Sequence, residues 1–107
     1  MDKNHAKNAL IRFREALQKK GFKIDKMVLF GSYSNGTQRE DSDIDVVVIS
    51  DGFRNLGYWE RIDVLSKAIY EVFEPIEATA YTLEEWAVDN STIHEYAKNG
   101  EYLQPAP

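Results

Sequence analysis

Cysteine is absent from this chain of 107 residues. Its absence excludes disulfide bonds, thiolate metal sites and cysteine nucleophiles together, and it fits a reducing compartment. Clusters of basic residues are lacking as well, since 13 Lys and Arg stand against 18 Asp and Glu and give a formal charge of −5. Non-specific nucleic-acid binding draws its affinity from clustered cationic side chains. We therefore expect no direct nucleic-acid partner.

Long apolar runs are also missing. No segment approaches the length of a membrane span, and residues 1–20 contain no apolar stretch of the kind found in export signals. These absences predict a cytoplasmic protein without a membrane partner. The length fits one domain over residues 1–107, and shares of 43% hydrophobic and 29% charged residues are typical of a globular protein.

The apolar residues that are present follow two kinds of spacing. From Ala6 to Leu17 and from Tyr58 to Phe73 they recur every three or four residues, which predicts amphipathic helices. Short continuous or alternating apolar runs predict strands, and Thr82 and Ser91 are suited to begin further helices. Strands separated by a helix imply an α/β fold in which helices pack on a small mixed sheet. The predicted order is helix 6–17, strand 26–30, polar turn and loop 33–41, strand 43–50, helix 58–73, strand 76–81, helix 82–87 and helix 91–97.

A pair of aspartates opens the second predicted strand. Side chains two residues apart in a strand face the same way, so Asp43 and Asp45 project together while Ile44 and Val46 face the opposite side. Adjacent carboxylates repel, and a hard cation such as Mg²⁺ relieves that repulsion. An isolated Asp-x-Asp is more often a solvated turn, but this pair follows a glycine turn and precedes a strongly apolar strand. That context favours a metal site.

The glycine turn comes directly after the first predicted strand. Gly31 lets the backbone bend sharply and lets a phosphate approach without a Cβ in the way. Ser32 supplies a hydroxyl and a backbone N–H at the start of the next turn, where anions are favoured. Alone, a Gly-Ser pair is more often a plain corner with a capping serine.

Together these residues resemble a known signature. Gly31-Ser32, ten residues, and then Asp43-Ile44-Asp45 are similar to the motif of the nucleotidyltransferase superfamily that includes DNA polymerase beta, and the short chain resembles its minimal nucleotidyltransferase (MNT) branch. The resemblance runs from the N-terminal helix to about Trp86. It implies the polymerase beta-like fold, with Asp43 and Asp45 as metal-binding residues and Gly31 and Ser32 as triphosphate-binding residues.

The resemblance also implies a third carboxylate on a later strand. Glu77 suits that role because it lies on the strand after the crossover helix and faces away from Ile76 and Ala78. Glu74 is the competitor, but it precedes Pro75 and falls at the helix end or in the loop. Asp43, Asp45 and Glu77 are therefore the expected catalytic and Mg²⁺-binding residues.

Other motifs in the chain fail on inspection. Residues 31–36 have the glycine spacing of a P-loop, but Thr37-Gln38 stands where Lys and Ser or Thr are required. Residues 41–45 are similar to a calcium loop, yet Val46 occupies the glycine position. His5 and His94 lack partners at ligand spacing and are expected at the surface.

Several aromatic residues remain without a role in this motif. They are expected either to pack in the core or along its edge, or to form a surface for a partner, because aromatic residues are enriched in interfaces. The residues concerned are Tyr58, Trp59, Trp86, Tyr96 and Tyr102.

Two hypotheses of function follow. The resemblance implies an enzyme that transfers AMP from ATP to an acceptor hydroxyl, namely a tyrosine of a HEPN-domain toxin. The chain would then act as an antitoxin. We expect it to form a hetero-oligomer or a homo-oligomer. The alternative is a weak or inactive relative that neutralises its partner by contact. The alternative is motivated by Glu77, where many relatives have Asp, and by Tyr33, where a basic residue is common.

Overall fold

The computed structural model describes residues 2–104. Every helix and strand that the sequence predicts is confirmed, with small shifts at the ends. One strand, β4, was not predicted. The elements are α1 (Lys3–Lys19), β1 (Lys26–Phe30), α2 (Ser32–Asn35), β2 (Ile44–Ile49), the short 3₁₀ helix η1 (Asp51–Phe53), α3 (Tyr58–Val72), β3 (Ile76–Tyr81), α4 (Leu83–Val88), α5 (Thr92–Ala97) and β4 (Glu101–Tyr102).

The strands form one mixed sheet in the order β3-β2-β1-β4. β1 runs antiparallel to both β2 and β4. β2 and β3 run parallel, as expected for strands joined by the crossover helix α3. The predicted mixed α/β sheet is therefore confirmed, and β3 lies at one of its edges.

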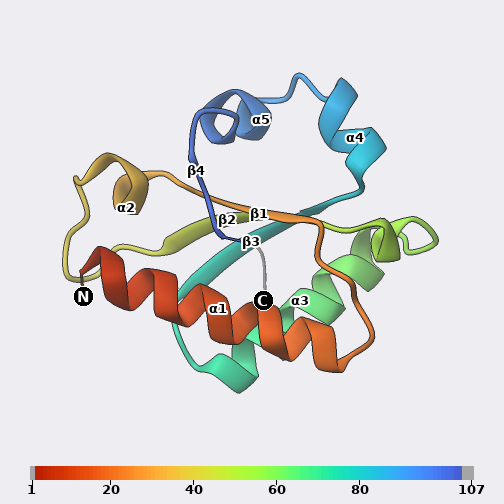
Figure 1. The fold of residues 1–107 in the computed structure, drawn as a ribbon, viewed down its shortest axis with the longest axis horizontal. Helices are drawn as coiled ribbons and strands as arrows, with labels where there is room; N and C mark the ends of the chain where they lie inside the picture. Colours follow the sequence, from red (N-terminus) through yellow and green to blue (C-terminus); the bar gives the residue numbers. More distant parts are fainter. Residues whose placement is uncertain (1, 105–107) are drawn as a thin grey trace.

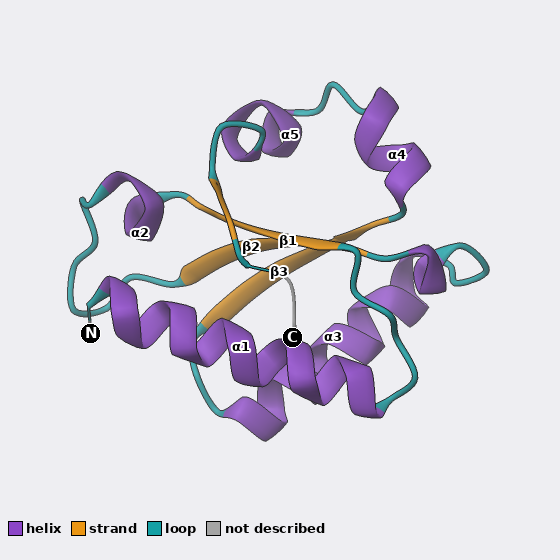
Figure 2. Ribbon diagram, viewed as in Figure 1, coloured by secondary structure: helices purple, strands orange, loops and turns teal. Residues whose placement is uncertain are grey.

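Helices cover both faces of this sheet. Figure 1 and Figure 2 show α1 and α3 on one face, with α4 and α5 on the other. The alternation along β2 matches this arrangement: Val46 and Val48 are buried with α1 and α3, whereas Val47 and Ile49 are buried with Trp86 of α4. Each such side chain contributes on the order of 1.5–3 kcal/mol through burial. Asp45 has the same parity as Val47, so it faces the side of α4 and α5.

The helix ends follow the signals in the sequence. Gly21 ends the first helical region in the left-handed conformation, with φ of 95°. Thr82 Oγ1 accepts a hydrogen bond from the Glu85 N–H, and Glu85 accepts one from the Thr82 N–H, which completes the predicted capping box of α4. Ser91 accepts a hydrogen bond from the His94 N–H at the start of α5.

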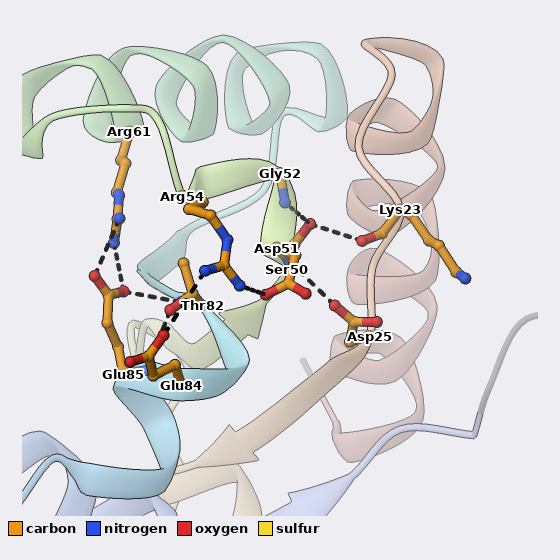
Figure 3. Close-up of polar contacts among 10 residues, drawn as sticks. All are labelled: Lys23, Asp25, Ser50, Asp51, Gly52, Arg54, Arg61, Thr82, Glu84 and Glu85. Atoms are coloured by element: carbon orange, nitrogen blue, oxygen red, sulfur yellow. Dashed lines mark hydrogen bonds and ion pairs between the residues drawn. The ribbon is translucent and has the colours of Figure 1, made fainter.

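Polar contacts fix the end of the sheet where β2 and β3 finish (Figure 3). Arg61 of α3 donates to both carboxylate oxygens of Glu85, at 2.7 and 3.1 Å, and so ties α3 to α4. Ser50 is buried; its hydroxyl donates to the Lys23 carbonyl at 2.6 Å and accepts from the Gly52 N–H. This end of the sheet is rigidly pinned, and the opposite end carries the aspartates.

The two ends of α3 differ from the apolar pattern read in the sequence. Tyr58 and Trp59 are 70% and 76% exposed, and Phe73 is 83% exposed. Packing is wrong for Tyr58 and Trp59, whose exposure agrees with the alternative of a partner surface, because the buried residues of α3 begin only at Leu65 and continue to Val72, its last residue. Phe73 follows the end of α3 and does not continue its apolar face. Trp86 is buried, as predicted. Within residues 2–104, no helix combines the length and apolar character required to cross a membrane.

Candidate active site

Gly31 makes the turn between β1 and α2. Its φ of 73° and ψ of −151° lie in a region that glycine alone adopts readily. Its carbonyl accepts hydrogen bonds from the N–H groups of Ser34 and Asn35, at 3.1 and 3.0 Å, which closes the single turn of α2. Gly36, with φ of 76°, ends α2 in the left-handed conformation. The polar turn predicted from Tyr33 is confirmed, and it forms the single helical turn Ser32–Asn35.

The carboxylate of Asp45 lies directly against Gly31. A Cβ added to Gly31 would stand 2.3 Å from Asp45 Oδ2, closer than nonbonded atoms approach. Asp45 therefore occupies the space where a Cβ of residue 31 would lie. We had predicted that a phosphate approaches Gly31 on this side. The two halves of the motif are thus in contact, which explains why a residue without a side chain is needed at Gly31.

Glu77 lies beside Asp45 on the neighbouring strand. Asp45 and Glu77 are paired in the parallel register of β2 and β3, so their side chains leave the same face of the sheet. Asp43 precedes the first residue of β2 and is exposed. Burial, together with the negative charges of Glu77 and Asp43, raises the pKa of Asp45 to about 6. The structure thus brings the three predicted carboxylates close enough to influence one another.

Glu74 makes a different contact. Its carboxylate pairs with His5 Nε2 of α1 at 2.5 Å, and it lies on the loop before β3. Burial raises the pKa of Tyr33, and the charges of Glu74 and Asp43 add to that rise. Glu74 therefore approaches the edge of the acidic group, while Glu77 holds the position in register with Asp45.

The carboxylates are neighbours without forming a closed ligand cage. In the part of the chain that the structure describes, no three Asp, Glu or His side chains are arranged tightly enough to hold a metal ion as they stand. Asp43 and Glu77 are exposed, and exposed side chains change rotamer rapidly. Two of the three carboxylates can therefore move toward Asp45 without disturbing the fold.

A cavity of about 390 Å³ opens beside Asp45. One wall consists of Gly31, Ser32 and Asp45, and the other comes from the end of α5 and the turn after it, with Tyr96 and Asn99. Its volume falls within the range of small-molecule sites. No Lys or Arg is among the described residues that line it. Both Gly31 and Ser32 thus border a space of suitable size next to the carboxylates.

The wall of the cavity formed by Tyr96, Asn99 and Gly100, which we call the α5 wall, was not predicted from the sequence. Tyr96 was assigned to packing or to a partner surface, but it is 71% exposed and borders the cavity. Nothing in the local sequence signals this position, because it depends on how α5 folds back over β1. His94, expected at the surface, is half-buried and packs against Trp86, with ring centroids 4.5 Å apart and ring planes tilted by 58°. His5 is exposed, as predicted.

Comparison with known proteins places this geometry in a family. Residues 10–98 match the family model of the nucleotidyltransferase domain. The chain belongs to the nucleotidyltransferase domain family. The Gly-Ser turn, the Asp-x-Asp pair and Glu77 all fall inside the matched region of this nucleotidyltransferase domain.

Individual relatives agree with this assignment. The protein adenylyltransferase MntA of Shewanella oneidensis is 44% identical over 48 residues, which cover 44% of this chain and 34% of that protein. The chain thus matches about a third of its curated relative. Two solved structures share the fold over 94% of this chain and 73% of theirs: a toxin–antitoxin complex with AMP-PNP (TM-score 0.64, 23% identity) and a double Asp-to-Glu mutant of the MntA-HpeT toxin–antitoxin pair (TM-score 0.59, 24% identity).

Proposed function

We propose that this nucleotidyltransferase domain transfers AMP from ATP to the hydroxyl of a tyrosine on a HEPN-domain toxin, and thereby acts as an antitoxin. One observation supports the proposal above all others. Asp45, Glu77 and Asp43 lie close together at the end of the sheet where β1 turns through Gly31 and Ser32. This is the arrangement that transfer of a nucleotidyl group requires, since carboxylates and a phosphate-binding turn must meet at one point.

The carboxylates suit a magnesium ion. They offer only oxygen donors, which Mg²⁺ prefers, and a cation would relieve the repulsion through which Glu77 and Asp43 raise the pKa of buried Asp45. We propose that Asp43, Asp45 and Glu77 hold the metal. Magnesium bound there would neutralise the triphosphate charge and make an acceptor hydroxyl more nucleophilic.

The residues of the chain would divide the remaining work. Ser32, with its hydroxyl and backbone N–H at the start of α2, is placed to donate to the triphosphate from one wall of the cavity. Asp45, half-buried and fixed against Gly31, would hold its position while exposed Asp43 and Glu77 adjust. Glu77 is open to an incoming acceptor and is placed to accept the proton of its hydroxyl. Attack at the α-phosphorus releases pyrophosphate.

The proposed partner rests on the relatives. MntA is named a protein adenylyltransferase, and both solved neighbours are toxin–antitoxin complexes, one of them with AMP-PNP. We propose that the chain works in the cytoplasm, where ATP is available.

Transfer of label from ATP tests the proposal. The purified protein is incubated with Mg²⁺, ATP labelled at the α-phosphate, and the HEPN protein encoded by the adjacent gene. We expect label on a tyrosine of the partner, and at least a 100-fold lower rate with Asp45→Asn, because removing a metal ligand removes the site. Asp41→Asn, which changes an exposed carboxylate in the loop before β2, is the matched control and should label normally.

A second function is favoured by the open arrangement of the carboxylates. A domain that neutralises its partner by contact alone would bind it equally well in the Asp45→Asn form and would leave it unlabelled. Equal label with wild type and Asp45→Asn, or none with either, would therefore reject the enzymatic proposal. Suppression of toxicity by Asp45→Asn in cells would then support the contact mechanism.

A further inference from the structure

We propose that Tyr96 and Asn99, at the end of α5, form the base-binding wall of the nucleotide site and favour adenine over guanine. This inference rests on the proposed function, since it assigns the part of the site that would recognise the nucleotide. It names residues outside the Gly-Ser and Asp-x-Asp motif, and in a region that carries no motif of its own.

The first step is the position of the cavity. It lies between the Gly31 turn on one side and residues 96–100 on the other, so a ligand held by Ser32 and Asp45 extends toward α5. Figure 1 shows α2 at one end of β1, while α5 lies over the face of the sheet opposite α1. A nucleotide whose phosphates meet the carboxylates has its base at a distance from them, which is where the α5 wall stands.

The second step is the exposure of Tyr96. Its ring is 71% exposed, whereas its neighbour Ala97 is fully buried against the sheet. The buried alanine fixes the backbone of α5, and the tyrosine ring borders the cavity from that fixed point. An aromatic ring that borders the cavity from a helix held against the sheet is a suitable platform for stacking a base.

The third step is the close contact between the α5 wall and β1. A Cβ added to Gly100 would stand 2.4 Å from the Leu29 carbonyl oxygen, and the Gly100 N–H donates to the Ala97 carbonyl at 2.8 Å. The chain after α5 therefore lies directly on β1, close to the Gly31 turn that follows it. The wall that carries Tyr96 and Asn99 is thus positioned by backbone contacts.

The fourth step concerns the kind of base. The amide of Asn99 offers one acceptor and one donor, which match the N6 donor and N7 acceptor on the edge of adenine. Guanine presents two acceptors, O6 and N7, on the same edge, so the Asn99 side-chain oxygen, itself an acceptor, would face an acceptor. No cationic side chain among the described lining residues competes for this edge. The wall therefore discriminates by hydrogen bonding and stacking.

Calorimetric titration with three probes tests the inference: MgATP, MgGTP and magnesium tripolyphosphate. We expect Tyr96→Ala to weaken MgATP binding about tenfold or more, as loss of a stacking ring does elsewhere, and Tyr96→Phe to restore it. Tripolyphosphate, which has no base, should bind wild type and Tyr96→Ala alike. Asn99→Ala should lower the preference for ATP over GTP. Tyr70→Ala, which removes another ring that is 79% exposed but lies on α3, is the matched control.

The outcomes separate this inference from the proposed function. If Asp45→Asn abolishes MgATP binding while Tyr96→Ala binds MgATP like wild type, the inference is overturned and the metal site stands. Equal weakening of MgATP and tripolyphosphate by Tyr96→Ala would also overturn it, because the effect would not involve the base. Failure of wild type to bind any of the three probes would overturn both.

Discussion

Asp45 carries a negative charge that folding disfavours and that the proposed metal site requires. It lies half-buried against Gly31, beside Glu77, and its pKa is raised to about 6 by burial and by the neighbouring carboxylates. In the folded protein the ionised form is therefore disfavoured relative to the unfolded chain, whose aspartates titrate near 3.8. The folded state binds this proton more tightly, so its stability falls as the pH rises from about 4 to about 6 and stays reduced above that range.

Replacing the charge should reverse this cost. We expect Asp45→Asn to raise the free energy of unfolding at pH 8, without metal, by about 1 kcal/mol, since each pKa unit corresponds to about 1.4 kcal/mol and the partial exposure of Asp45 lets solvent screen its charge. The gain should shrink as the pH is lowered toward 4, where wild type is protonated at this position. Urea unfolding at several pH values measures both quantities. Asp41→Asn should change little, and a destabilised Asp45→Asn at pH 8 would contradict the assignment.

Local residue patterns predicted part of this site. The parity of a strand was enough to place Asp45 on the face opposite Val46, and the capping signal at Thr82 fixed the end of β3. The contact of Asp45 with Gly31 was not predictable, because it depends on the antiparallel register that pairs Phe30 with Asp45. Tyr96 enters the cavity from a distant helix, so no spacing in the sequence could assign it.

At the level of elements, α2 connects the Gly31 turn to the loop that leads to Asp43 and Asp45. This single turn is bounded by two glycines with almost the same φ, 73° at Gly31 and 76° at Gly36. Their surroundings differ: a Cβ at Gly31 meets the Asp45 carboxylate, whereas a Cβ at Gly36 meets nothing within 4 Å. Their ψ angles differ as well, −151° at Gly31 and 18° at Gly36, so only Gly36 lies in the left-handed helical region that other residues can adopt.

We expect Gly36→Ala to destabilise the protein by about 1 kcal/mol, the usual cost of a left-handed residue with a Cβ. Gly31→Ala should cost about 3 kcal/mol, because the displaced carboxylate adds an overpacking penalty. Chemical denaturation of the two variants gives the comparison. The double variant Gly31→Ala with Asp45→Ala should recover only the part of the loss that comes from the clash with the carboxylate; a double variant as unstable as Gly31→Ala alone would contradict the contact.

The remaining elements show where sequence patterns stop. β4 has only Glu101 and Tyr102, too few residues for a period-two signal, and it exists because β1 offers them an edge. The apolar face of α3 was predicted to begin at Trp59, but that ring is exposed and the buried residues begin at Leu65. At the other end Val72 is buried, and Phe73 is exposed because it follows the helix in the left-handed conformation. Spacing reports which side of a helix is apolar, but it does not report how long the opposing surface is.

At the level of the whole molecule, charge decides how a nucleotide can bind. The chain carries a formal charge of −5, and the described lining of the cavity has an aspartate and no cationic residue. Such a surface repels a triphosphate unless a divalent cation lies between the two. The affinity for ATP should therefore depend on metal more strongly than in a site built from lysines or arginines.

Metal removal tests this dependence. With Mg²⁺ present, ATP at 100 times its dissociation constant should stabilise the folded state by about 2.7 kcal/mol. With EDTA in place of Mg²⁺, thermal unfolding should occur at the same temperature with and without ATP. Mn²⁺ should restore the stabilisation, since it accepts the same oxygen ligands. Equal stabilisation by ATP in EDTA would show that the carboxylates play no part in binding.

The location of β3 at the border of the sheet determines the size of molecule that can be modified. Glu77 stands on a strand with a neighbour on one side only, and its side chain is exposed. A hydroxyl on the surface of a folded macromolecule could reach it without entering a tunnel or unfolding. Enclosure therefore cannot provide selectivity at this position. The choice of acceptor would instead be made by the area of contact around it, which lets a domain this small act on a target larger than itself.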